Sequence, residues 1–405
     1  MKVSESLELR NGITLKNRFF KSAMSETMAN GRNQPGEKHV RLYHEWAKGG
    51  AGVVVTGNVM VDRNALGEPG NVVIEDEKDM DMLKRWAEKG TEYDTHLWMQ
   101  INHPGKQSPK TMSKEPVAPS AIPMGEALKG AFNPPRTLEN GEIKKIVERY
   151  VKTAEVAKKA GFTGVQIHGA HGYLVNQFLS PHDNRRDDEY GGDLENRMRF
   201  LMEIYKGMRR VLGETFPISL KLNSSDFNKE GFTEAESFAV VEKMAEMGLD
   251  LIEISGGNYE QPKMSTGTDS EVFFLDYAQK LKEKVDIPVV VTGGFRSKES
   301  MEAALEKGHT DMIGIARPMA LDPHLPNRIM SGDYKRITTR RLTTGIKGLD
   351  EKVGPAVGNV YYAMQLKRIA EGKEAQQHTN AWRPLLHLIA THGPQALKPK
   401  RRKKE

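Results

Sequence analysis

The chain has 405 residues, of which 38% are hydrophobic and 28% charged, as expected of a globular protein with a sizeable core. The absence of cysteine excludes a disulfide framework and any iron–sulfur cluster bound by cysteine. No apolar run approaches the length of a membrane span, and the first residues, MKVSESLELR, lack the apolar core of a signal peptide. We therefore expect a cytoplasmic protein with no membrane partner.

The net charge of +6 is concentrated at the C-terminus. Residues 398–405, KPKRRKKE, carry six basic side chains and one acidic one, so the rest of the chain is near +1. A run of this kind is most often a solvated, disordered end, with nuclear targeting or polyanion binding as the alternative. Since no basic stripe runs through the remaining sequence, we expect no specific nucleic-acid partner.

The predicted elements begin with a β-hairpin. Residues 7–17, LELRNGITLKN, alternate apolar and polar side chains around Asn11-Gly12. An Asn-Gly pair supplies the positive φ angles of a type I′ turn, so the pattern predicts two short antiparallel strands.

Short apolar segments and segments of helical periodicity follow along the chain. Several of the expected helices end at glycines, which favour the conformation of a helix C-cap. Strands are expected at residues 18–22, 53–55, 96–101, 165–168, 217–222, 251–255, 288–292 and 312–315, and helices at residues 37–48, 77–89, 142–160 and 194–212.

Two segments do not fit this pattern. Residues 106–140 contain many Pro, Ser and Gly and are too long for a simple connector, so we expect a lid at the C-terminal ends of the strands. Beyond residue 321 a helix is expected near residues 360–370, after which the periodicity is lost.

The segment GFTGVQIHGAHGYLVNQFLSPHDNRRDDEYGG, residues 161–192, is the strongest functional signal. An apolar strand ends on His168, and His171 and Tyr173 follow, separated by small residues that let each side chain point into a shared space. A solvated histidine pair or half of a zinc site are the alternatives. The zinc alternative is weakened because HGAH lacks the Glu and the i, i+4 spacing of a zinc-protease helix.

This motif and its flank resemble the old yellow enzyme family, the FMN-dependent ene-reductases built on a (β/α)8 barrel. The family signature H-x-x-H or H-x-x-N is followed by x-Y and by N-Q-F-L-S-P-x-x-N-x-R-x-D-x-Y-G-G. The chain carries this run in register as Asn176, Gln177, Phe178, Leu179, Ser180, Pro181, Asn184, Arg186, Asp188, Tyr190, Gly191 and Gly192. The resemblance covers residues 7–373.

The resemblance implies an α/β fold, a (β/α)8 TIM barrel with an N-terminal β-hairpin and a C-terminal helical and basic extension. Residues 1–373 would form one FMN-binding barrel domain, and residues 374–405 an extension that ends in the basic tail. We can assign no function to this extension from its sequence.

An FMN site at the C-terminal mouth of the barrel is also implied. Ser25 falls where the family places a Thr or Cys against a flavin carbonyl, and Gln100 where it places an amide against the flavin pyrimidine edge. A structural role in the barrel lining is the alternative for Gln100. The implied cofactor-binding residues are Ala23, Met24, Ser25, Gly57, Gln100, Lys221, Gly293, Gly294, Ala316 and Arg317.

Two of these positions carry charge. A lysine in a barrel strand is costly to bury without an anionic partner, and Lys221 stands where the family has an Arg or Lys that stabilises the reduced flavin. Arg317 and the adjacent Gly293-Gly294 loop suit a phosphate group. Ala316 is a departure, because the family usually has Gly before that arginine.

The implied reaction has two steps at one site. NADH or NADPH reduces FMN, and an α,β-unsaturated carbonyl compound or a similar small molecule is then reduced in its place. His168 and His171 would hold the substrate carbonyl oxygen, and Tyr173 would deliver a proton to the α-carbon. A homo-oligomer is compatible with this interpretation.

Two other classes of protein remain as alternatives. The first is a metal-dependent or Schiff-base TIM-barrel hydrolase or aldolase, for which Lys221 is the one interior lysine we can nominate. Gln100 and Arg317 at flavin-type positions argue against it. The second is a non-catalytic flavin-binding barrel, and the intact His168 and Tyr173 argue against that.

Overall fold

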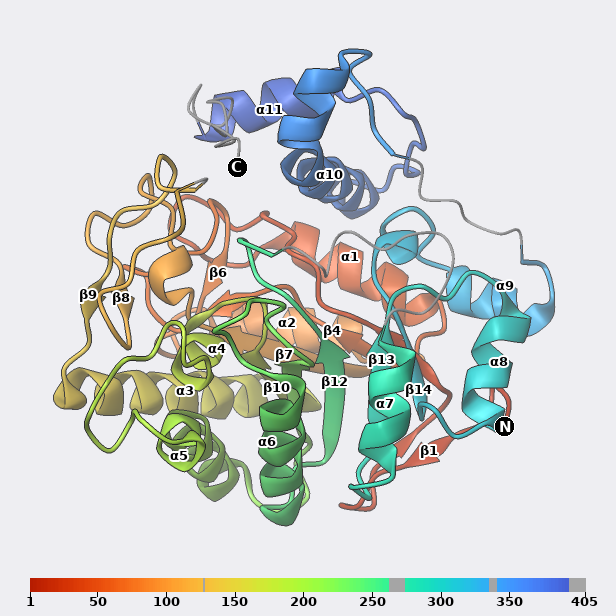
Figure 1. The fold of residues 1–405 in the computed structure, drawn as a ribbon. Helices are drawn as coiled ribbons and strands as arrows, with labels where there is room; N and C mark the ends of the chain where they lie inside the picture. The colour runs from red at the N-terminus through yellow and green to blue at the C-terminus, as the bar shows by residue number, and fades with distance from the viewer. Residues whose placement is uncertain (127, 262–273, 335–340, 393–405) are drawn as a thin grey trace.

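Eight parallel strands form a closed barrel in the computed structural model, which describes residues 1–126, 128–261, 274–334 and 341–392 (Figure 1). Each strand pairs with the next along the chain, and pairing of the last strand, β14, with the first, β3, closes the barrel. The barrel strands are β3 Phe19–Lys21, β4 Val53–Val55, β7 His96–Asn102, β10 Gly164–Gly169, β11 Ile218–Asn223, β12 Leu251–Ser255, β13 Val289–Thr292 and β14 Met312–Ile315. The predicted (β/α)8 TIM barrel is therefore confirmed.

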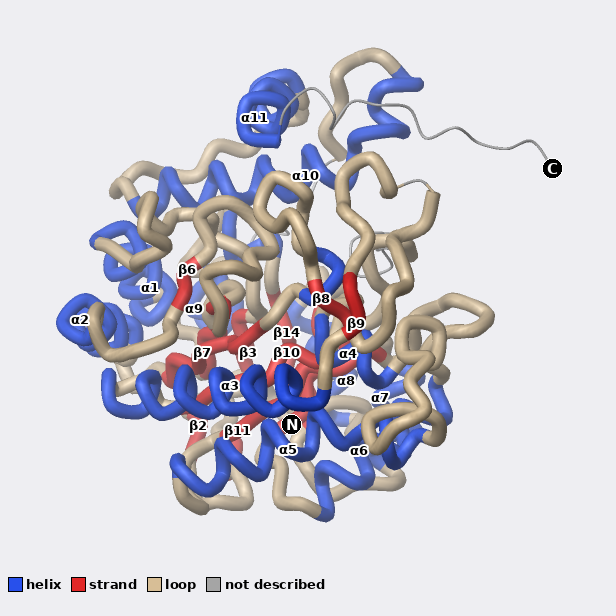
Figure 2. The backbone as a smooth tube through the Cα atoms, turned by 90° about the vertical axis from the view of Figure 1, so that its left-hand side faces the viewer, coloured by secondary structure: helices blue, strands red, loops and turns tan. Residues whose placement is uncertain are grey.

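Helices surround the strands, as Figure 2 shows with the strands at the centre. They are α1 Glu37–Lys48, α2 Met80–Gly90, α3 Asn140–Ala160, α4 Leu174–Leu179, α5 Leu194–Leu212, α6 Glu234–Glu246, α7 Leu275–Lys282, α8 Lys298–Glu306 and α9 Leu325–Ser331. Asp193 caps α5 by accepting a hydrogen bond from the backbone N of Asn196 at 2.9 Å. Among the described residues, no helix is long and apolar enough to cross a membrane.

The barrel interior below the mouth is apolar. Alternate residues of the strands point inward, as the two-residue period of a strand requires. The inward side chains and the hairpin residues that pack against them form one cluster: Leu9, Leu15, Phe20, Val53, Val55, Trp98, Leu251, Val290 and Met312. The hairpin thus closes the N-terminal end of the barrel. A ligand site can therefore form only at the C-terminal ends of the strands.

The hairpin forms as predicted, but its turn is different. Strands β1 Leu7–Glu8 and β2 Thr14–Leu15 pair antiparallel. Gly12 has a φ of +80° and its N donates to the O of Leu9 at 2.9 Å, whereas Asn11 has no positive φ and its Oδ1 accepts from the N of Ile13. The type I′ prediction was therefore wrong, because Asn11 uses its side chain and only Gly12 adopts the left-handed conformation.

The segment of residues 106–140 lies at the mouth end of the barrel (Figure 1). It contains the parallel strands β8 Val117–Ala118 and β9 Arg136–Thr137, and the 3₁₀ turn η1 Gly105–Gln107 lies at its start. Two short strands extend the sheet beside β7, and they are β5 Val59–Met60 and β6 Val72–Val73. The lid role of the segment stays a prediction.

The C-terminal part is more helical than the sequence suggested. Helix α10 spans Lys347–Ala370 and packs against α1, so the expected helix at 360–370 was too short. Three glycines and a proline in its first half interrupt the apolar periodicity. Helix α11, Trp382–His392, lies in the extension that was expected to be helical, and Leu385 and Leu388 pack with the preceding Ala381 against α10. The basic tail lies outside the described residues.

Lys21 is a fully buried cation in the layer between the barrel and α1. Its Nζ donates to the O of Val55 at 2.9 Å and lies 3.9 Å from the centre of a Trp46 ring. Burial lowers the pKa of Lys21 to about 7, and the nearby Glu26 only partly opposes this shift. Lys21 is therefore a site where stability depends on pH.

We predict that Lys21→Met stabilises the protein most at neutral and lower pH. In the unfolded chain the pKa of Lys21 is near 10.5, and in the folded protein it is about 7. Between these values the unfolded state holds a proton that the folded state lacks, so the wild-type free energy of unfolding gains up to about 1.4 kcal/mol per pH unit from this group. The advantage of Lys21→Met should therefore shrink as the pH rises.

Urea unfolding of both proteins at pH values from 6 to 9 measures this difference. Lys129→Met, on an exposed lysine, is the matched control and should give a difference independent of pH. A constant difference between Lys21→Met and wild type would contradict the prediction.

Candidate active site

The structure brings the three side chains of the sequence motif together at the C-terminal end of β10. The ring of His168 lies 5.1 Å from that of His171 and 4.8 Å from that of Tyr173, centre to centre. His168 and Tyr173 are buried. The arrangement gives one small space lined by two imidazoles and a phenol.

His171 has a strained backbone. Its φ is +63°, a left-handed conformation that a residue with a side chain adopts at a cost of about 1 kcal/mol. Asn223 accepts a hydrogen bond from the N of His171 at 3.1 Å, and Gln107 donates one to its O at 2.9 Å. The Nε2 of His171 lies 2.6 Å from the Oγ of Ser255 on β12. These contacts fix the direction of the imidazole.

Both histidines are uncharged at neutral pH. Burial lowers the pKa of His168 and of His171 well below the usual value, and the charge of Lys221 adds to this effect. The Nδ1 of His168 accepts a hydrogen bond from the N of Ala170 at 3.3 Å. Its proton therefore resides on Nε2, which can donate a hydrogen bond to a ligand.

Tyr173 has a phenolic partner that the sequence did not reveal. Its hydroxyl oxygen lies 2.9 Å from that of Tyr259, and the two rings meet edge to face. Burial raises the pKa of both phenols, and the charge of Glu68 raises them further. Tyr259 belongs to the loop of residues 259–274, where sequence spacing carries little information. Residues 262–273 of that loop lie outside the described residues.

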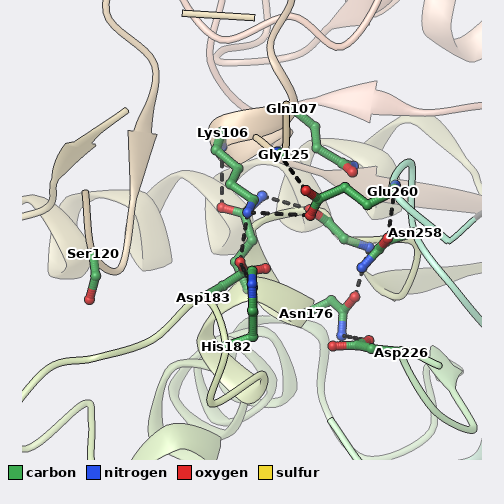
Figure 3. A network of polar contacts seen from close by, with 12 residues as sticks. Lys106, Gln107, Ser120, Gly125, Asn176, His182, Asp183, Asp226, Asn258 and Glu260 are labelled. Atoms are coloured by element: carbon green, nitrogen blue, oxygen red, sulfur yellow. Dashed lines mark hydrogen bonds and ion pairs between the residues drawn. The ribbon is translucent and has the colours of Figure 1, made fainter. Parts of the chain in front are cut away.

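A buried ion cluster holds the loops around Tyr259 (Figure 3). The Nζ of Lys106 lies 2.6 Å from the Oδ1 of Asp183 and 3.8 Å from the Oε2 of Glu260. Glu260 also accepts a hydrogen bond from the N of Gly125 at 2.6 Å. Since Glu260 follows Tyr259 directly, the cluster ties the position of this phenol to three other loops of the barrel mouth.

A chain of polar side chains crosses the barrel above its apolar layer. The Nε2 of Gln100 donates to the Oε1 of Gln166 at 2.7 Å, and the Nε2 of Gln166 donates to Glu253 at 3.0 Å. Glu253 also accepts from Lys221 at 3.0 Å and from Thr292 at 2.7 Å. Glu253 is the anionic partner that a buried Lys221 requires. Its only sequence signal is an acid within the apolar strand LIEIS.

The predicted residues after β3 and β4 lie close together. The N of Gly57 donates to Glu26 at 2.9 Å, and a Cβ on Gly57 would lie 2.5 Å from the O of Met24, so no larger residue fits. Ser25 donates a hydrogen bond to Glu68. Its hydroxyl can rotate about one bond to another acceptor. Ala23 packs against the apolar barrel layer.

The predicted phosphate loops follow β13 and β14. Gly293 and Gly294 have φ angles of +92° and +87°, which residues with a side chain rarely adopt, and the N of Gly293 donates to the O of Gly314 at 3.1 Å. Arg317 starts the 3₁₀ turn η3, Arg317–Ala320, and Ala316 precedes it with a negative φ of −117°. Within the described part of the chain, the Arg317 guanidinium forms no hydrogen bond or ion pair. A phosphate group fits this combination of free cation and left-handed glycines.

Comparison with known proteins gives the same assignment. Residues 5–336 match the NADH:flavin oxidoreductase / NADH oxidase family. The chain is 38% identical to the NADH-dependent flavin oxidoreductase iliE of Hypocrea jecorina, over 80% of this chain and 88% of that protein. It is 31% identical to a cinnamate reductase of Clostridium sporogenes, over 80% of this chain and 52% of that longer protein.

A solved structure supports the fold and the cofactor. Morphinone reductase in complex with tetrahydroNAD superposes with a TM-score of 0.70 at 25% identity, over 82% of this chain and 92% of that one. With the family match, this confirms the resemblance drawn from the motif. The chain belongs to the NADH:flavin oxidoreductase / NADH oxidase family, as an old yellow enzyme-type oxidoreductase that uses FMN with NADH or NADPH as hydride donor.

Proposed function

We propose that the protein reduces the activated C=C bond of α,β-unsaturated carbonyl compounds, with the nicotinamide and the substrate using one site in turn. The observation that carries the proposal is the convergence of two neutral imidazoles and a protonated phenol at the barrel mouth. The name of the cinnamate reductase, a relative that acts on an alkene conjugated to a carboxyl group, supports the same class of substrate.

The residues present fit FMN. Gln100 and Lys221 would contact the pyrimidine side of the ring, and Ser25 a ring carbonyl once its hydroxyl leaves Glu68. Arg317 and the Gly293-Gly294 loop would hold the phosphate group. Bound FMN supplies the hydride that reaches the β-carbon of the substrate.

The protein's own part is to bind the carbonyl and to move one proton. The Nε2–H of His168 and the imidazole of His171 would donate hydrogen bonds to the carbonyl oxygen, where negative charge develops. Tyr173 would give its proton to the α-carbon. Tyr259 would stabilise the resulting phenolate by donating the hydrogen bond that joins the two hydroxyls at 2.9 Å.

The first prediction from this proposal concerns the colour of the protein. The purified protein should be yellow, should bleach on anaerobic addition of NADH or NADPH, and should regain its colour with an enone such as cyclohexenone. Visible absorption spectra record all three steps. A colourless protein that FMN cannot reconstitute would contradict the proposal and favour the hydrolase alternative. A protein that bleaches but does not react with enones would support the flavin site and contradict the proposed substrate class.

The second prediction separates the two phenols. Tyr173→Phe should leave flavin reduction by NADH nearly unchanged and slow enone reduction about 100-fold or more, because general acid catalysis is lost. Tyr259→Phe should slow only the same step, by up to about tenfold, as expected for one hydrogen bond. Stopped-flow absorbance measures each half-reaction separately. Equal losses in both half-reactions would argue against the proton-donor role.

The third prediction concerns the imidazoles. Phenolate ligands should bind the oxidised protein and give a long-wavelength absorption band. His168→Ala should weaken this binding about tenfold or more, because the donor on Nε2 is removed. Titration with 4-hydroxybenzaldehyde at constant pH measures the affinity. Unchanged affinity would show that the anion lies elsewhere. His324→Ala, at a histidine that pairs with Glu45 of α1 and takes no part in the site, provides the control.

A further inference from the structure

Glu253 is a buried carboxylate at the centre of the polar chain. It has no exposed surface, yet Leu251, two residues earlier on the same face of β12, belongs to the apolar layer of the barrel. Replacing a buried ion pair by apolar side chains is often neutral or stabilising, so structure alone does not require an acid here. The chemistry of its partners points to a further role.

The first consequence of Glu253 is the direction of the amide chain. A carboxylate only accepts hydrogen bonds, so Gln166 must turn its NH2 group toward Glu253. The Oε1 of Gln166 then faces Gln100, which must turn its own NH2 group inward. The orientation of both amides is thereby fixed, and the Oε1 of Gln100 is left as an acceptor without a partner among the described residues.

The second consequence is the charge beside Lys221. The Nζ of Lys221 lies 3.0 Å from Glu253, and Lys221 is opposite His168 in the register of β10 and β11. Each partner is at least nine-tenths buried, so solvent screens their interaction little. The carboxylate therefore offsets much of the field that Lys221 alone would exert on the barrel mouth.

We propose that Glu253 is a positioning residue that sets the electrostatics of the flavin site. It holds Lys221 in place, limits how strongly this cation stabilises negative charge on the flavin, and turns the acceptor of Gln100 toward the ligand side. The inference rests on the proposed FMN site, and it concerns the reduction potential and anion affinity of the bound flavin rather than the reaction it performs.

Glu253→Gln tests the proposal without changing the size of the side chain. Its neutral amide keeps an acceptor for Lys221 and Thr292 but removes the negative charge. The reduction potential should move to a more positive value, and sulfite should bind the oxidised flavin about tenfold more tightly or better. Sulfite is the probe because its product with flavin is an anion, and absorbance titration gives its affinity.

Three further variants make the result specific. Thr292→Val removes one hydrogen bond to Glu253 without changing any charge, so sulfite affinity should stay within about twofold. Lys221→Gln should shift the affinity in the opposite direction. Glu253→Asp draws the carboxylate back from Lys221 and should tighten sulfite binding by a smaller factor, which keeps the test available if Glu253→Gln does not fold.

The outcomes separate this inference from the proposed function. A wild-type protein that takes up no FMN would end the proposed function before Glu253 is tested. A yellow wild type whose Glu253 variants bind sulfite with unchanged or weaker affinity would overturn the role of Glu253 alone. Tighter binding in the Glu253 variants, with Thr292→Val unchanged, would establish it.

Discussion

The site depends on the change from apolar to polar side chains between two neighbouring layers of the barrel interior. Leu251 packs in the lower layer, and Glu253, one pleat above it, joins four strands through hydrogen bonds. A carboxylate is tolerated in such a place only when its oxygens are paired. Glu253 requires Lys221, Gln166 and Thr292, and each of them needs an acceptor, so the polar layer forms as one unit. The imidazoles and the phenol of the candidate site lie on the mouth side of this polar layer.

The same rule governs the loops around the mouth. Lys106 and Asp183 are nearly as buried as the barrel pair, with side-chain exposures of 2% and 6%. Removing one partner would leave a buried charge unpaired, which typically costs about 3–5 kcal/mol. Glu260 adds a second carboxylate and a hydrogen bond to the loop at Gly125. Charge pairing therefore acts together with buried apolar side chains such as Met124 and Phe132 to order residues 106–140, whose sequence shows no periodicity.

The local features of this molecule could be predicted from the sequence. The apolar run that ends on His168 could be recognised as a strand because periodicity and flanking glycines are short-range signals. Three barrel helices likewise end directly before the glycines that predicted their C-terminal ends. The resemblance supplied the closure of the barrel, and it is also the source of the proposed roles of Gln100 and Arg317, which spacing alone leaves open.

Contacts between distant segments could not be predicted in this way. Tyr259 meets Tyr173 across 86 positions, and Lys221 meets Glu253 across 32. No short-range pattern encodes such pairs, because they exist only once the barrel closes. The prediction of the hairpin turn type was wrong for a different reason. The side chain of Asn11 competes with the backbone for the hydrogen bond that selects the turn type.

Desolvation sets the protonation of the whole site in one direction. Burial favours the uncharged form of each group, which lowers the pKa of His168 and His171 and raises that of Tyr173 and Tyr259. In the proposed reaction the carbonyl is neutral on binding and gains negative charge as the hydride arrives. Neutral donors bind it modestly at first and more strongly as that charge develops, which is the condition for lowering a barrier. A permanent imidazolium would also attract anions that are not substrates, so uncharged donors suit a site that binds a neutral carbonyl compound.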